Sequence, residues 1–348
     1  MSMEPKTDPK AIAAELKSRL QAVASRFVEG ASEITRLSRL SGGASQETWS
    51  FAVASPAGES SWILRRAPLV MKGQGNRNTM AAGLETEAKL LRLSAAAGVP
   101  VPEVGYVLAP EDAAGTGFVM RHVEGETMPR RILREDRFAA ARERLAFQCG
   151  ACLARIHSIP LDTLPPLRSA PGFAEVDAYR ARYDEYGFAK PVFELAFRWL
   201  YDNPPSTSGQ IALVHGDFRH GNLMIDENGL AAALDWELAH LGDPMEDLGW
   251  MCVNAWRFGN IDQPVGGFGT RDELCAGYES VTGKPVDRAA LHYWEVFGTL
   301  KWGVICDGMA NTFKTGVERT VERATIGRRA SETDIDLLAL LAPKKKGA

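Results

Sequence analysis

The chain has 348 residues, a formal net charge of −4, 45% hydrophobic residues and 24% charged residues. It is longer than the roughly 100 to 200 residues of a usual single domain, so we expect one large domain or two lobes. The composition is that of a folded globular protein and excludes long disorder, collagen and disulfide scaffolds. A net negative charge offers no general attraction for a phosphate backbone, so we expect no nucleic-acid partner.

The first third of the chain is predicted to form a helix and a small antiparallel sheet, because short β-rich runs alternate with tight turns. In chain order, we expect a helix over 10–28, strands over 34–40, 48–54 and 62–66, a helix over 84–97, and strands over 103–108 and 117–123. This segment becomes the first lobe, placed over residues 1–121.

After residue 136 the periodicity is mostly helical. We expect a helix over 138–159, a proline-rich loop over 160–172, helical structure over 176–200, short strands over 211–214, 223–225 and 231–234, and helices from 245 onward. The prediction is therefore an α+β fold with a small sheet-bearing N-terminal lobe and a larger, mostly helical lobe over 122–348.

Compartment and membrane contacts are predicted from what the sequence lacks. The five cysteines show no paired disulfide spacing, the first 20 residues are not an apolar leader, and no apolar run approaches the roughly 20 residues of a membrane span. We expect a cytoplasmic protein that contacts no membrane, and the sequence leaves its oligomeric state open. Cys149 and Cys152 have C-x-x-C spacing but no second pair, so buried helix cysteines are favoured over a zinc site.

Polar residues follow two of the short strands in the second lobe. The motif H-G-D-F-R-H-G-N occupies 215–222, and Asp235 directly follows the strand at 231–234. Phosphoryl transfer needs a base that aligns the acceptor hydroxyl and metal ions that neutralise phosphate charge. In this interpretation Asp217 accepts the proton, while Asn222 and Asp235 supply hard oxygen ligands for Mg²⁺. The alternative is that all three side chains only cap turns.

With both halves of this pattern present, the chain resembles the aminoglycoside phosphotransferase and choline kinase family. The similarity covers roughly residues 34–310 and includes the trailing Asp243-Pro244 and Asp247. It implies a two-lobed protein-kinase-like fold and a kinase dependent on ATP and magnesium, with Asp217 as its catalytic base. It also implies that Asp247 and His215 support the catalytic loop.

The resemblance assigns nucleotide binding to the first lobe. Gly42, Gly43 and Ser45 match the family's nucleotide loop between two strands, where backbone amides approach phosphates. The alternative is a plain hairpin turn. Met120 and His122 match the hinge whose backbone would bond adenine, although a buried edge strand would have the same sequence.

An arginine stands where kinases carry a phosphate-binding lysine. Arg65 aligns best with that lysine, and Glu87 with the helix glutamate that pairs with it. An arginine can grip phosphate oxygens through two donors, so function can survive the change. As the alternative, Glu87 belongs to a solvated helix face.

The motif style is closest to the phosphotransferase domains associated with acyl-CoA dehydrogenases. This implies a hydroxy acid or hydroxyacyl-CoA as the small-molecule acceptor. Candidate pocket residues are Arg219, Trp256, Arg257 and Trp302, although the two tryptophans also suit a core.

Two rival functions stay open. A catalytically inactive nucleotide-binding regulator of the same fold is suggested by Arg65 at the lysine position. A metal-dependent hydrolase would instead gather His215, Asp217, His220 and Asp235 around zinc or manganese.

Overall fold

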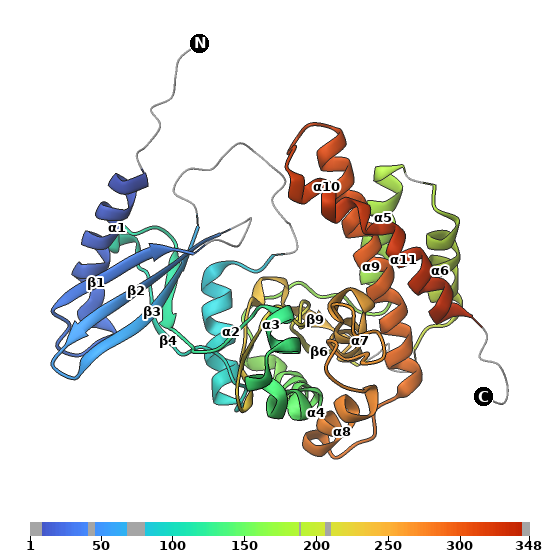
Figure 1. Cartoon of the computed structure of the whole chain (residues 1–348), viewed down its shortest axis with the longest axis horizontal. Helices are drawn as coiled ribbons and strands as arrows, with labels where there is room; N and C mark the ends of the chain where they lie inside the picture. Colours follow the sequence, from blue (N-terminus) through green and yellow to red (C-terminus); the bar gives the residue numbers. More distant parts are fainter. Residues whose placement is uncertain (1–8, 41–45, 68–80, 188, 206–209, 343–348) are drawn as a thin grey trace, which may run out of the picture. The chain divides into compact units, whose positions relative to one another are not determined.

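A computed structural model describes residues 9–40, 46–67, 81–187, 189–205 and 210–342 (Figure 1). The chain divides into two compact units, the first made of Met1–Ala96 and Val101–Glu124, and the second of Ala97–Pro100 and Gly125–Ala348. The boundary predicted from the sequence lies after residue 121. The first unit holds a five-stranded sheet and the second is mostly helical, so the α+β class is confirmed.

The first unit is built on one antiparallel sheet with the strand order β1-β2-β3-β5-β4. Its elements are α1 (Pro9–Val23), a 3₁₀ turn (Ala24–Arg26), β1 (Glu33–Arg39), β2 (Glu47–Ser55), β3 (Gly58–Arg66), α2 (Leu84–Ala96), β4 (Val104–Val107), a 3₁₀ turn (Pro110–Asp112) and β5 (Gly117–Arg121). Every expected strand and helix of this segment is present, with shifted ends.

The two faces of this sheet follow from the alternation of side chains along a strand. Phe51 of β2 and Trp62 and Leu64 of β3 belong to one buried cluster, which also contains residues of α1 such as Leu20. Arg65 is next to Leu64 on the strand and therefore lies on the opposite face, where it meets α2. One face of the sheet thus makes the core of the unit and the other presents Arg65.

The second unit is assembled around α9 (Arg288–Lys314), the long helix that α5, α7, α10 and α11 contact. Its other helices are α3 (Pro129–Arg134), α4 (Ala139–His157), α5 (Ala174–Tyr186), α6 (Pro191–Asp202), α7 (Met245–Cys252), α8 (Arg271–Thr282), α10 (Val321–Arg328) and α11 (Ala330–Leu341). None of the helices within the described ranges is long and apolar enough to cross a bilayer.

Four short strands of this unit form two antiparallel pairs. β6 (Ala212–Val214) pairs with β9 (His240–Gly242), and β7 (Leu223–Asp226) pairs with β8 (Gly229–Ala233). The end of β6 lies opposite the start of β9, and the start of β7 lies opposite the end of β8. The loops 215–222 and 234–239 therefore leave the ladders at corresponding ends. The strand β9 was not predicted.

Candidate active site

The loop that follows β6 is held by a buried carboxylate at the start of α7. Asp247 accepts the backbone N–H of His215 at 2.8 Å and of Gly216 at 2.9 Å. The Nε2 atom of His157 lies 3.1 Å from the same carboxylate. Burial opposes ionisation of Asp247, but the bond and charge of His157 and the backbone donors outweigh it, so the pKa of Asp247 lies below its usual value. This is the supporting role expected of Asp247.

Gly216 is a position where the loop requires glycine. Its φ is +81°, and a Cβ atom would lie 2.4 Å from the carbonyl oxygen of Leu238. This left-handed conformation and close approach bring the loop after β6 against the turn after β8. The two loops that carry the predicted site residues therefore touch.

Asp217 is surrounded by hydrogen-bond donors from three side chains. Trp250 Nε1 donates to Oδ1 at 2.9 Å, and Asn222 Nδ2 donates to Oδ2 at 2.6 Å. Arg219 Nε lies 3.0 Å from Oδ1 and 3.2 Å from Oδ2. The two Arg219 distances belong to one N–H group shared by both oxygens, so three N–H groups bond a carboxylate that offers about four lone-pair positions. Trp250 is not among the site residues predicted from the sequence, so its bond to Asp217 was missed.

Asn222 and Asp235 come from the two touching loops. The backbone N–H of Leu234 donates to the Asn222 carbonyl at 2.8 Å, which brings the start of the second loop next to Asn222. Both side-chain contacts of Asn222 with Asp217 use Nδ2, so its amide oxygen is the atom that would face an ion. Asp235 has a left-handed backbone with φ +65°. A carboxylate and an amide oxygen are hard ligands that fit Mg²⁺.

The two histidines of the loop are packed as neutral rings. His215 Nδ1 accepts the N–H of Asp217 at 3.3 Å, and burial lowers the pKa of His215. His220 contacts the carbonyl of Gly266 through Nδ1 at 2.7 Å, and burial lowers its pKa to about 4. The two rings bond separate partners. Within the described residues, the side chains of His215, Asp217, His220 and Asp235 do not gather closely enough to hold one metal ion, as a hydrolase site would require.

Another group of side chains has the spacing of a metal site: Glu175, His240 and Glu246 lie within 4.8 Å of one another. Both carboxylates already form ion pairs with protein cations: Arg168 pairs with Glu175, and Lys301 lies 3.2 Å from Glu246. The two carboxylates are thus balanced by two protein cations. We interpret this group as a buried charge network rather than a metal centre.

In the first unit, the expected cation and glutamate are paired. Arg65 Nη2 lies 3.3 Å from Glu87 Oε1, and its Nε and Nη2 also donate to Gln46 Oε1 at 3.3 and 3.0 Å. Arg66 instead bonds Glu47 and is buried. The arginine that pairs with the glutamate of α2 is therefore Arg65, as the family resemblance predicted.

The remaining nucleotide-site predictions are less defined by the structure. Met120 is buried on β5, which pairs with strands on both sides, and the backbone N–H of His122 donates to Ser61 at 3.1 Å. Gly42, Gly43 and Ser45 (within 41–45) lie outside the described residues. All five positions stay predictions.

Of the four candidate pocket residues, three adjoin one another. The guanidinium of Arg219 lies over the Trp256 ring at 4.7 Å, and the Trp256 and Trp302 rings are 4.9 Å apart. Arg257 points elsewhere, because it donates to the Cys252 carbonyl and pairs with Glu295 at 3.0 Å. The place of Arg257 in the pocket stays a prediction.

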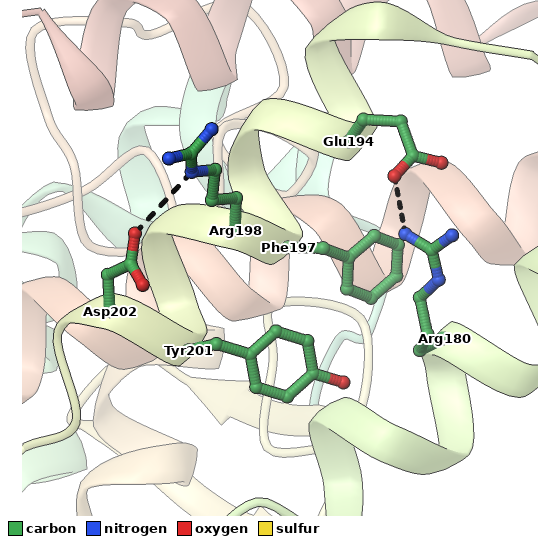
Figure 2. Close-up of a pocket in the computed structure, with 6 residues that line it drawn as sticks. All are labelled: Arg180, Glu194, Phe197, Arg198, Tyr201 and Asp202. Carbon is green, nitrogen blue, oxygen red and sulfur yellow. Dashed lines mark hydrogen bonds and ion pairs between the residues drawn. The ribbon is translucent and has the colours of Figure 1, made fainter.

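A surface depression between α5 and α6 lies apart from these residues in sequence (Figure 2). Its charged lining residues are paired, with Arg180 at 2.5 Å from Glu194 and Arg198 at 3.7 Å from Asp202. Paired charges leave little unmet bonding capacity for a ligand, so we assign no function to this depression.

Comparisons with solved structures place this fold among known phosphotransferases. A Ralstonia eutropha protein, provisionally assigned as an aminoglycoside phosphotransferase, has a TM-score of 0.70 and 20% identity over 93% of this chain and 97% of its own. A choline/ethanolamine kinase family protein from Mesorhizobium loti has a TM-score of 0.59 and 17% identity over 96% of each chain. At these identities the likeness shows the kinase-like phosphotransferase fold.

Among curated proteins, acyl-CoA dehydrogenase family member 11 of Gallus gallus is 29% identical over 201 residues, which are 56% of this chain and 25% of that protein. A probable acyl-CoA dehydrogenase of Arabidopsis thaliana is 27% identical over 332 residues, 86% of this chain and 38% of that protein. The chain thus spans about a quarter to two fifths of the length of these relatives. Residues 36–283 match the phosphotransferase enzyme family. The chain therefore belongs to this family and is a phosphotransferase.

Proposed function

We propose that the chain is a kinase that uses ATP and Mg²⁺ to phosphorylate the hydroxyl group of a hydroxy acid or a hydroxyacyl-CoA. The observation that carries the proposal is Asp217: it sits on a loop fixed by Asp247 and bonds Asn222, in a chain of the phosphotransferase family. The buried, unbridged cysteines fit a reducing compartment such as the cytoplasm.

In this proposal Asp217 takes the acceptor's proton as the hydroxyl oxygen attacks phosphorus. Trp250 and Asn222 orient its carboxylate from two sides. Asn222 and Asp235 would hold Mg²⁺, which when bound neutralises charge on the phosphate oxygens. The protein contributes mainly position and charge, which is what phosphoryl transfer requires.

The nucleotide would be held by the first unit. Arg65 carries a positive charge oriented by Glu87 and Gln46, and its guanidinium can bond two phosphate oxygens at once. We assign the loop with Gly42, Gly43 and Ser45 to the phosphates and the segment with Met120 and His122 to adenine. A structural neighbour with a TM-score of 0.54 was solved as a ternary complex with streptomycin and ATP, which supports ATP as the donor.

The acceptor class is inferred from the relatives and from local charge. The curated relatives are named acyl-CoA dehydrogenases, and this chain matches only part of each, which favours an acyl compound as the acceptor. Arg219 places a cation beside Asp217. A cation in this position suits an acidic acceptor better than a polycationic drug or a quaternary amine.

The second candidate is a nucleotide-binding regulator without turnover, and the observation in its favour is Arg65 at the lysine position. One experiment separates the two functions. ADP release from Mg-ATP is measured across hydroxy acids, hydroxyacyl-CoA esters, choline, sugars and aminoglycosides, for the wild type, Asp217→Ala and the exposed control Asp262→Ala.

We expect acceptor-dependent ADP release that is lost in Asp217→Ala, retained in Asp262→Ala, and accompanied by unchanged ATP binding in both variants. ATP binding without ADP release for any acceptor would favour the regulator. Full ADP release by Asp217→Ala would contradict the assigned base.

A further inference from the structure

The ring of His240 faces two groups that can only accept hydrogen bonds. Its Nδ1 lies 3.0 Å from the carbonyl oxygen of Leu238, and its Nε2 lies 3.1 Å from Oε2 of Glu246. Burial opposes ionisation of Glu246, but His240 and Lys301 lower its pKa to about 2, so this carboxylate has no proton to donate at neutral pH. A neutral imidazole carries a single N–H and could make only one of the two bonds. Both bonds form together only when His240 is an imidazolium.

The charges around His240 favour a protonated ring. Glu246 of α7 and Glu175 of α5 place carboxylates beside it, and one ligand atom from each of the three side chains lies within 4.8 Å of the others. The cations that face these carboxylates are Lys301, on Glu246, and Arg168, on Glu175. Burial opposes the charge of His240, but the charge and the hydrogen bond of Glu246 outweigh it and raise the pKa of His240.

Glu246 joins His240 to Lys301, and these two cations reach different loops of the candidate site. Oε2 of Glu246 bonds His240, while Oε1 lies 3.2 Å from Nζ of Lys301. The same Nζ lies 3.4 Å from the carbonyl oxygen of Gly216, in the loop of the proposed base. His240 bonds the carbonyl of Leu238, in the loop of the proposed metal ligand. One buried carboxylate thus connects the two loops through two side-chain cations.

The position of Asp235 depends on how its loop is held. Its backbone is left-handed, with φ +65°, a conformation that a residue other than glycine keeps only where surrounding contacts enforce it. Before Asp235, the N–H of Leu234 bonds the carbonyl of Asn222. After it, the carbonyl of Leu238 bonds His240. Asp235 therefore stands between two anchors, and loss of His240 would remove the donor of the second.

We propose that His240 is a positioning residue that acts as an imidazolium: with Glu246 and Lys301 it forms a clamp that holds the loop of Asp235 against the loop of Asp217. The clamp fixes the metal ligand relative to the base, although none of its three side chains takes part in the transfer. The inference rests on the proposed function for the roles of Asp217 and Asp235, and it adds the residues that set their relative position.

Long-range ¹H–¹⁵N spectra of the histidine rings test the charge of His240 without nucleotide, metal or acceptor. The signals of His240 are identified as those missing in His240→Asn. We expect the wild-type ring to show the imidazolium pattern at neutral pH and to keep it above about pH 6.5, where half of an unperturbed histidine is neutral. His220, whose pKa burial lowers to about 4, is the internal control and should show the neutral pattern. A neutral pattern for His240 at neutral pH would overturn the inference.

Binding of Mn²⁺ in place of Mg²⁺, with ADP present, tests the positioning role and is measured from the paramagnetic resonance of free Mn²⁺. We expect His240→Phe to weaken Mn²⁺ binding roughly tenfold, the lower end of what partners of metal ligands contribute. His240→Asn should recover most of this affinity, because its amide N–H can reach the Leu238 carbonyl in place of Nδ1. A packing role predicts the opposite order, because phenylalanine suits a buried site better than asparagine does. The control His292→Asn changes a histidine of α9 outside the clamp and should match the wild type.

Two binding results would also overturn the inference: equal Mn²⁺ affinity in the wild type and His240→Phe, or weaker binding by His240→Asn than by His240→Phe. The proposed function fails separately. Absent ADP release with every acceptor would reject only the kinase, and absent Mn²⁺ binding by the wild type would reject the assigned metal ligands. In either case the protonation of the His240 ring still decides whether the clamp exists.

Discussion

Replacing Lys301 by methionine should destabilise the second unit markedly. Lys301 is 4% exposed, and its Nζ lies 3.2 Å from Glu246 and 3.4 Å from the Gly216 carbonyl. Burial opposes its charge, but the carboxylate of Glu246 outweighs this effect and raises the pKa of Lys301. Burial likewise opposes ionisation of Glu246, yet His240 and Lys301 together lower its pKa to about 2. Both groups are therefore ionised at neutral pH.

The magnitude follows from the carboxylate that methionine would leave behind. Breaking a buried ion pair from one side costs about 3–5 kcal/mol, because an uncompensated charge stays buried. Glu246 keeps His240 at 3.1 Å, so we expect the lower end, about 3 kcal/mol. For a unit of this size, each kcal/mol lowers Tm by roughly 2–4 °C, which predicts a decrease of about 6–12 °C.

Urea unfolding of the full chain, followed by tryptophan fluorescence and far-UV circular dichroism, measures this loss. Lys301→Met/Glu246→Gln removes both charges and should recover part of the stability, because no unpaired carboxylate remains. The exposed control Lys284→Met should stay within about 0.5 kcal/mol of the wild type. A free energy of unfolding for Lys301→Met within about 1 kcal/mol of the wild type would refute the reasoning, as would a double variant no more stable than the single one.

Three further predictions concern single contacts. Trp250→Phe keeps a ring but removes the donor to Asp217, a bond worth about 1.5–3 kcal/mol, so kcat for ADP release should fall roughly 10- to 100-fold with ATP binding unchanged. The unfolded chain protonates His220 below about 6.5, whereas the folded chain resists until about 4, so the free energy of unfolding should fall by about 2 kcal/mol between pH 7 and pH 5. His220→Asn should flatten that dependence in urea titrations, and an unchanged slope would contradict it. Arg65→Ala should weaken ATP binding in calorimetry more than Arg65→Lys does, whereas Arg92→Ala, an exposed α2 change, should not.

The sheet of the first unit could be predicted from local pattern because one of its faces is a core. Alternation in β2 and β3 fixed which residues face inward, and it put Arg65 on the opposite side from Trp62 and Leu64. The three-residue strand β9 could not be predicted in this way. It is too short for any periodicity, and its pairing with β6 depends on segments almost 30 residues apart.

The candidate site likewise contains residues that the sequence pattern predicts and residues that it does not. Asp217, Asn222 and Asp235 stand out because they follow short strands at fixed spacing, and the bond from Leu234 to Asn222 explains why the two segments meet. Trp250 could not be predicted in this way: it is a buried core residue whose ring nitrogen also bonds the carboxylate of Asp217. One sequence signal was available for this role, since Trp250 is three residues after Asp247 on the same helix.

The sequence around Lys301 predicts a buried ion pair but not its partner. A lysine inside the apolar stretch 296–306 is almost never buried without a partner, so its position alone predicts an internal acid. The identity of that acid, Glu246, depends on how α7 packs on α9, and Gly249 controls that approach. A Cβ atom at Gly249 would lie 2.4 Å from the Trp294 backbone. Tertiary packing of this kind leaves no local pattern in the sequence.

These contacts also explain why the proposed base is fixed. The N–H of Gly216 is bonded by Asp247 and its carbonyl by Lys301, so the residue before Asp217 is bonded on both its backbone groups by side chains that are themselves buried. The carboxylate is then oriented by Trp250, which is also buried. Buried groups thus fix the carboxylate of Asp217, which is the preorganisation that its proposed role as a general base requires.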